Sequence, residues 1–223
     1  LVRLRQRAGE LLKAEIDYAA TVIRGFVHPL PHAGTTLNAA WQRAVRARSA
    51  FEAASGSVRA EAPEVRRWLT SYRAALNAVT GACVTLEEHV AAARPESLDP
   101  RFVVAVDDYV DALRGEPPSA GQPWTVDARH LAETDAQLRD AAGLLDRQNT
   151  AQRVLLAETN QSLADVVDLV DHGWRHGRDL GFLGLPVFDL GVECCFLSSL
   201  ERGDVLGVVG QEPLVGGEVE DLL

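Results

Sequence analysis

Three aspartates close together in the chain have the spacing best suited to chemistry. Asp107, Asp108 and Asp111 form the pattern Asp-Asp-x-x-Asp, which occurs on a helix in class I isoprenoid synthases. Carboxylates one helical turn apart face the same side of a helix, and they can bridge Mg²⁺ ions that hold a diphosphate. The pattern therefore defines one candidate metal site.

The apolar residues around these aspartates favour a structural interpretation. Tyr109 and Val110 belong to the apolar stripe of the same segment, so the aspartates are predicted to face water. An opposing acidic face would have to come from Asp165, Asp168 and Asp171, and the second metal-binding motif of the synthases is not recognisable. We therefore predict a solvated helix face and keep Mg²⁺-dependent isoprenoid diphosphate chemistry as the enzyme alternative.

A histidine pair and a cysteine pair form a second candidate, a zinc site. His172 and His176 have the spacing of two ligands on one helix face, and Cys194 and Cys195 could complete the set. Adjacent cysteines rarely ligate one zinc ion together, and the glutamate of the metalloprotease motif is missing. We expect surface histidines here. No catalytic, cofactor-binding or metal-binding residue is predicted elsewhere in the chain.

The clearest pattern in the chain is a heptad repeat between residues 65 and 93. Such a repeat keeps one stripe of a helix buried along its whole length, and it predicts an all-α fold. Within the repeat, Cys83 is expected to be a small buried hydrophobe and not a nucleophile. Its apolar residues alternate steps of four and three: Val65, Leu69, Tyr72, Leu76, Val79, Cys83, Leu86, Val90 and Ala93.

Proline, glycine and capping residues divide the chain into an antiparallel bundle of about five long helices. The polar run over residues 146–152 interrupts the last apolar stripe and allows one long helix or two, of which we favour one. The helices are expected over residues 2–27, from Thr35 or Thr36 to about 59, over 63–94, over 99–115, and from Thr125 or Asp127 to about 170.

The composition changes near residue 170. All 32 alanines lie at or before Ala164, whereas ten of the 18 glycines lie between Gly173 and Gly217. Each glycine in place of alanine costs a helix interior about 1 kcal/mol. We therefore expect a helical domain over residues 1–170 and an irregular, glycine-rich, acidic tail over residues 171–223. This tail is expected to be disordered or not native to the domain.

The charge pattern argues against nucleic-acid binding. Residues 1–178 carry 21 basic and 23 acidic side chains, whereas residues 179–223 carry one basic and nine acidic ones. The helical part therefore has no broad basic field. The sequence also has no uncharged apolar run of about 18 residues that would span a bilayer. We expect no nucleic acid, no cofactor and no tightly bound small molecule as a ligand.

The first residues of the chain contain a basic cluster. Arg3, Arg5, Arg7 and Lys13 would mark the cytoplasmic end of a preceding membrane helix, or they form an ordinary solvated helix face. The chain begins with Leu1 and contains no methionine. We therefore expect it to be a segment of a longer protein.

Three stretches of the chain resemble one family of membrane proteins. They are Tyr72-Arg-Ala-Ala-Leu-Asn-Ala78, Pro123-Trp-Thr-Val-Asp127 and Arg153-Val-Leu-Leu-Ala-Glu-Thr159. Over residues 1–170 the chain resembles the soluble C-terminal region of actinobacterial members of the fusaric-acid-resistance family. That resemblance implies a non-enzymatic helical domain at the cytoplasmic face of the membrane, within an exporter of aromatic acids.

The resemblance also implies which partners the chain would have. They are the exporter's own transmembrane part, which this sequence does not include, and further copies of the same protein. None of the three stretches is a catalytic motif, so the resemblance assigns no functional residue. A free-standing helical interaction scaffold is the other non-enzymatic alternative.

Overall fold

Six helices account for most of the chain that the computed structural model describes, namely residues 2–30, 32–56, 63–90, 98–116, 124–143 and 150–179. No strand is formed within these ranges, so the prediction of an all-α fold is confirmed. The helices are α1 (Val2–Arg24), α2 (Ala33–Ser55), α3 (Pro63–Val90), α4 (Pro100–Arg114), α5 (Ala128–Ala142) and α6 (Thr150–Asp179).

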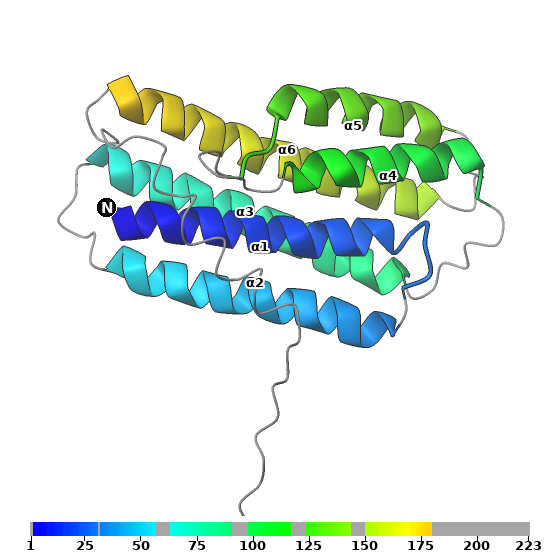
Figure 1. The fold of residues 1–223 in the computed structure, drawn as a ribbon, viewed down its shortest axis with the longest axis horizontal. Coiled ribbons are helices and arrows are strands. Elements are labelled where there is room, and N and C mark those ends of the chain that lie inside the picture. The colour runs from blue at the N-terminus through cyan, green and yellow to red at the C-terminus, as the bar shows by residue number, and fades with distance from the viewer. Residues whose placement is uncertain are drawn as a thin grey trace, which may run out of the picture.

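Five of the helices contact one another in a closed circuit. Helix α1 packs on α4, α4 on α5, α5 on α6, α6 on α3, and α3 on α1. Helix α2 packs against α1, outside this circuit. Figure 1 shows α1, α2 and α3 on one side of the bundle and α4, α5 and α6 on the other. We call these two sides the N-terminal half and the C-terminal half.

The buried face of α3 is the one that the heptad repeat predicts. Every repeat position from Val65 to Val90 is buried, and Ala93 lies outside the described residues. Tyr72, at the centre of this face, stacks on Trp68 with ring centroids 4.9 Å apart and meets the edge of Phe51 at 5.5 Å. Burying an apolar side chain of this size contributes about 1.5–3 kcal/mol. The seam is therefore a main source of the bundle's stability.

Two of the predicted helix starts are confirmed by their caps. The Asp99 side chain accepts a hydrogen bond from the backbone N–H of Arg101 at 2.8 Å, with Pro100 in the first turn of α4. Asp127 accepts from the backbone N–H of Arg129 and His130 at 2.9 and 3.2 Å and starts α5. Each cap satisfies amide groups that have no partner inside the helix.

The prediction of a threonine cap for α2 is wrong. Helix α2 begins at Ala33, and His32 takes the capping position with a left-handed backbone (φ 51°). The carbonyl of His32 accepts from the backbone N–H of Thr35 and Thr36 at 2.8 and 3.0 Å. These two threonines therefore lie inside the first turn, because a backbone carbonyl already starts the helix before them.

The two ends of the connection from α4 to α5 are held together by backbone and side-chain hydrogen bonds. Gly115 has a φ of 65°, and a side chain there would place its Cβ 2.2 Å from the Thr125 carbonyl oxygen. Glu116 and Thr125 form an isolated antiparallel bridge, and the Trp124 indole N–H donates to the Arg114 carbonyl at 2.7 Å. The left-handed glycine therefore lets the two ends of the connection approach closely.

The prediction of one long last helix is wrong, and the described residues form six helices where about five were predicted. Helix α5 ends at Ala142 before Gly143, and α6 begins at Thr150. Figure 1 shows α6 starting at the end of the bundle where α5 stops and running back. The polar run over residues 146–152 offers only Ala151 to continue the apolar stripe, and α5 and α6 pack as two separate helices.

Helical structure also continues further than the composition suggested. Helix α6 runs through Gly173 and Gly177 to Asp179, because adding a residue to an existing helix costs much less than starting one. The expected end of helical structure at residue 170 is therefore too early. Residues 180–223, which hold the rest of the expected tail, lie outside the described part of the chain.

Candidate functional site

The three aspartates of the candidate metal site lie on α4 in different surroundings. Asp107 is half-buried, and its carboxylate oxygens lie 2.8 and 2.9 Å from Nε2 of His28. Asp108 and Asp111 are exposed. The His28 contact ties the segment after α1 to the middle of α4, so Asp107 already has a structural partner.

The helix face around these aspartates agrees with the predicted orientation. Tyr109 and Val110 are each 1% exposed and point into the core. On α6, Asp165 is exposed and accepts a hydrogen bond from Gln161 at 2.8 Å, and Asp168 is also exposed. The side chain of Asp171 lies outside the described part. Within that part, no three His, Cys, Asp or Glu side chains are arranged to hold a metal ion.

The candidate zinc ligands cannot be brought together from the described residues. His172 and His176 lie on the backbone of α6, but their side chains are outside the description, as are Cys194 and Cys195. Cys83, by contrast, is fully buried on α3, and burial raises the pKa of its thiol well above the ordinary range. Because the thiolate is the nucleophilic form, Cys83 is inert.

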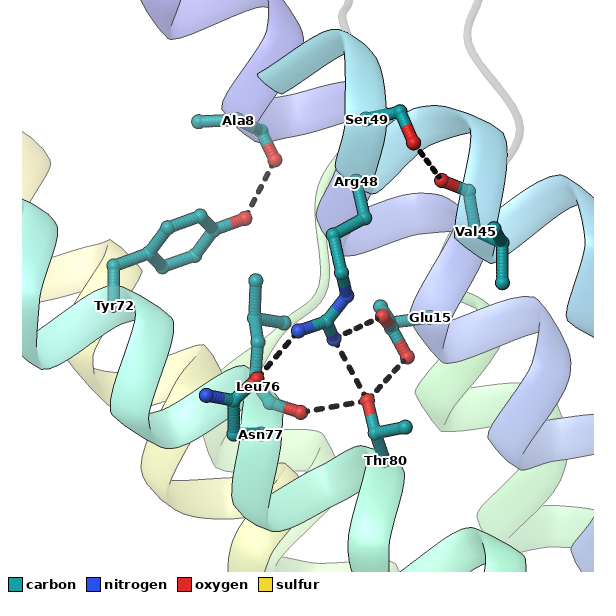
Figure 2. A network of polar contacts seen from close by, with 9 residues as sticks. All are labelled: Ala8, Glu15, Val45, Arg48, Ser49, Tyr72, Leu76, Asn77 and Thr80. Atoms are coloured by element: carbon teal, nitrogen blue, oxygen red, sulfur yellow. Dashed lines mark hydrogen bonds and ion pairs between the residues drawn. The ribbon is translucent and has the colours of Figure 1, made fainter. Parts of the chain in front are cut away.

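A polar network around one buried carboxylate joins the three helices of the N-terminal half. Glu15 of α1 is only 1% exposed, and its Oε1 lies 2.5 Å from Nη2 of Arg48 on α2. On α3, the hydroxyl of Thr80 accepts from Arg48 at 2.8 Å, and Asn77 Oδ1 accepts from the same guanidinium at 2.5 Å. Figure 2 shows these four side chains converging between the helices. We call them the Glu15 network.

The geometry of the Glu15 network satisfies the buried carboxylate. Thr80 Oγ1 lies 3.1 Å from Glu15 Oε2 and 2.9 Å from the Leu76 carbonyl, so its proton serves one of these two acceptors. Arg48 supplies the compensating charge and is itself about one-third exposed. Because an unpaired buried charge is very costly, this pairing disfavours any register of α1, α2 and α3 that separates Glu15 from Arg48.

Two buried tyrosines add further hydrogen bonds between α1 and α3. The Tyr72 hydroxyl donates to the Ala8 carbonyl at 2.6 Å, which Figure 2 also shows, and the Tyr18 hydroxyl donates to Glu87 at 2.6 Å. Burial raises the pKa of both hydroxyls well above the usual value, and the Glu87 contact adds to the effect at Tyr18. Both tyrosines are therefore neutral structural donors.

The C-terminal half has a second buried carboxylate with a less complete set of partners. Asp135 of α5 is buried, accepts from Arg139 one turn later, and accepts from Asn160 Nδ2 of α6 at 3.1 Å. Tyr109 Oη and Asn160 Oδ1 are buried without a hydrogen-bond partner among the described residues. Burial, followed by the charge of Asp135, raises the pKa of the Tyr109 hydroxyl. We call these four residues the Asp135 cluster.

Sequence reasoning missed both buried carboxylates, although a signal was present. Glu15 follows Leu4, Ala8 and Leu11 at heptad spacing, and Asp135 lies between Leu131 and Leu138 on one helix face. A charged residue at a seam position is predicted to be buried with a partner, because burial of an unpaired charge is unfavourable. The identity of that partner depends on the tertiary register and has no signature in the sequence.

An open groove of about 490 Å³ runs along the surface between α3 and α6. Its α3 side consists of small residues, and its α6 side is more polar. We call it the α3–α6 groove. It is lined by Ala78, Gly81, Ala82, Thr85, Leu155, Glu158, Gln161 and Ser162.

Comparisons with protein-family models, with curated proteins and with solved structures found no match for this chain. The resemblance to the fusaric-acid-resistance family therefore stays a prediction. None of the six helices, within the residues described, has an apolar stretch long enough to cross a bilayer.

Proposed function

We propose that this chain is a non-enzymatic helical domain of an aromatic-acid exporter of the fusaric-acid-resistance type. It would lie at the cytoplasmic face of the membrane and pack against the exporter's own transmembrane part. Its role in this proposal is mechanical: a bundle with a fixed helix register presents surfaces for assembly. The resemblance in the sequence and the structural roles of the matching residues support this proposal.

The observation that carries the proposal is where the three resembling stretches lie. In the first, Tyr72 is at the centre of the α3 seam and Asn77 belongs to the Glu15 network. In the second, the Trp124 indole donates to the Arg114 carbonyl at the end of α4, and Asp127 caps α5. In the third, Thr159 is buried on α6. These residues maintain a bundle, as a shared structural domain requires.

The buried ionisable groups support a non-catalytic role. Glu15 is committed to Arg48 and Thr80, and Asp135 to Arg139 and Asn160. A catalytic acid or base has to reach a substrate with its reactive atom, and it works best with a pKa near the operating pH. The carboxylates of Glu15 and Asp135 instead bind other side chains of the bundle.

The coding sequence on either side of this segment provides the first test. We expect several apolar spans of about 20 residues in the same reading frame. In the full-length protein, deleting residues 2–179 should then abolish or strongly reduce efflux of an aromatic carboxylic acid from whole cells. An open reading frame without any such span would contradict the exporter and favour the free-standing scaffold.

A binding experiment separates the proposal from diphosphate chemistry. Calorimetry with Mg²⁺ and a prenyl diphosphate should show no Mg²⁺-dependent binding to the intact chain. Tight binding that is lost in Asp111→Ala would contradict the proposal. Asp111→Ala is a better test than Asp107→Ala, because Asp107→Ala would also remove the contact with His28. A loss of binding could then result from a loss of structure.

A further inference from the structure

The polar groups that line the α3–α6 groove are satisfied, with one exception. The Thr85 hydroxyl donates to the Gly81 carbonyl at 3.0 Å, and the Ser162 hydroxyl donates to the Glu158 carbonyl at 3.0 Å. Gln161 donates to Asp165 at 2.8 Å. The Glu158 carboxylate has no hydrogen bond or ion pair with any described residue. The groove therefore offers one uncommitted negative charge.

The floor of the groove leaves room for another helix. A Cβ added at Gly81 would meet nothing within 4 Å, and the neighbouring Ala78 and Ala82 carry single methyl groups. Small residues let a second backbone approach closely. The part of α3 in the groove is about two helical turns long, so the matching surface must also be short.

The outer face of α2 carries small residues and positive charge, which complement the small residues and negative charge of the α3–α6 groove. Helix α2 packs against α1 on its opposite side, and Arg46 is exposed at the centre of its outer face. Ala39 and Ala53, seven residues before and after Arg46, are exposed on the same face. The nearby Ser49 hydroxyl is satisfied by the Val45 carbonyl at 3.0 Å. Arg43, three residues before Arg46 on the same side of the helix, is exposed as well. Neither guanidinium forms a hydrogen bond or ion pair with any residue of the described ranges, so this face offers two uncommitted positive charges.

Charge also distinguishes two possible occupants of the groove, the acidic end of this chain and α2 of a second copy. Residues 179–223 of the same chain carry nine acidic side chains and one basic side chain. Glu158 would repel such a segment, whereas it attracts Arg46. The face of α2, with its small residues and two arginines, is therefore a better match for the groove than the acidic end of the chain.

We propose that α2 of a second copy of this chain lies in the α3–α6 groove, with its Arg46 opposite Glu158. The two surfaces belong to different helices, so the contact is heterologous: each copy still offers a free groove at one end and a free α2 face at the other. Such a contact builds rings or open chains, and it does not stop at a two-fold dimer. This self-association does not depend on the exporter assignment.

Sedimentation velocity over a range of concentrations tests the contact with charge reversals. The native chain should associate reversibly at high concentration. Glu158→Arg alone and Arg46→Glu alone each place like charges opposite one another, and the dissociation constant should rise roughly ten-fold in each. The two variants mixed in equal amounts restore opposite charges at both kinds of contact, and association should return to within about three-fold of the native value.

Two further variants make the test specific to these surfaces. Gly81→Leu fills the groove without changing charge and should also raise the dissociation constant at least roughly ten-fold, while circular dichroism shows native helix content. Arg129→Glu reverses a charge on α5, outside both surfaces, and should leave association unchanged. A native chain that stays monomeric at every concentration would overturn the proposal. So would a dissociation constant that either single charge reversal leaves unchanged, or a mixture that fails to restore native association.

Discussion

The two halves of the bundle treat a buried carboxylate differently. In the N-terminal half, Glu15 meets a guanidinium from a second helix and a hydroxyl from a third. In the C-terminal half, Asp135 is paired with Arg139 of its own helix and with the amide of Asn160. The first arrangement links three helices through a charge pair, whereas the second links two through an amide.

The difference shows how buried polarity specifies a structure. A network in which each helix supplies a required partner allows only one relative position of the helices. A cluster that leaves Tyr109 Oη and Asn160 Oδ1 without partners among the described residues can lose a polar group with little effect. We therefore expect the same kind of substitution to have different effects in the two halves.

The largest effect should come from breaking the Glu15 network at its cation. Arg48→Met leaves the Glu15 carboxylate buried without its charge partner, which should cost about 3–5 kcal/mol of unfolding free energy. Urea denaturation followed by circular dichroism measures this. The double variant Glu15→Leu/Arg48→Met removes the charge as well and should recover most of the loss. A loss below about 1 kcal/mol in the single variant would show that the network is not essential.

Alkaline pH should reduce stability through both halves. The pKa values of the Cys83 thiol and of the Tyr18, Tyr72 and Tyr109 hydroxyls are raised in the folded chain, mainly by burial. Above about pH 8.5 for cysteine and pH 10 for tyrosine, the unfolded chain loses protons that the folded chain keeps. The unfolding free energy should then fall by about 1.4 kcal/mol per pH unit for each group.

The alkaline prediction is checked by denaturation between pH 8 and 11. Tyr72→Phe and Tyr109→Phe should each make the pH dependence shallower by the contribution of one group above pH 10. Stability that does not change up to pH 11 would contradict the burial of these groups.

At neutral pH the same two tyrosine substitutions should have different effects on the free energy of unfolding. Tyr72→Phe removes the hydrogen bond to the Ala8 carbonyl and should cost about 1 kcal/mol. Tyr109→Phe removes a buried hydroxyl that has no partner within the described structure, so it should be neutral or stabilise by up to about 1 kcal/mol. Thermal denaturation of the pair measures the difference. Equal losses in both variants would mean that the Tyr109 hydroxyl is bonded after all.

The smallest effect should come from an exposed ion pair in the N-terminal half. Arg73 of α3 binds Glu52 of α2 through two nitrogens at 2.8 Å, and Glu52 is about half-exposed. Arg73→Met also removes a hydrogen bond to the Ser55 hydroxyl and the contact with the Phe51 ring, and it should cost only about 0.5–1 kcal/mol. This substitution is the matched control for Arg48→Met, since both remove an arginine that joins α2 to α3. Similar losses in the two variants would contradict the importance of burial.

The sequence predicts the fold best where a local pattern determines burial. All eight heptad positions from Val65 to Val90 are buried, because a repeat of 3.5 residues leaves a helix only one stripe to bury. The Asp99 and Asp127 caps follow from local hydrogen bonding alone. Asp108 and Asp111 were also predicted to face water because their neighbours belong to the apolar stripe.

The features that the sequence did not predict depend on tertiary contacts. Helix α6 is separate from α5 and packs on α3, and no local pattern in the sequence predicts that contact. The pairing of Glu15 with Arg48 and Thr80 joins residues on three helices, so it exists only once their register is set. The α3–α6 groove likewise needs both helices in place before its small residues and Glu158 lie together.

The contact between α3 and α6 has a consequence for the order of folding. Contacts between neighbouring helices, such as α1 with α2 and α4 with α5, close short loops, whereas the partner of α3 is a helix that lies three helices further along the chain. On the ribosome, the flank of α3 that receives α6 is therefore synthesised long before its partner emerges. Contacts of long sequence separation form late because closing the intervening loop is entropically costly. Formation of the contact between α3 and α6 would be the slow step of folding. Nascent chains that end before Thr150 lack α6, so they would expose this flank of α3 and need a chaperone.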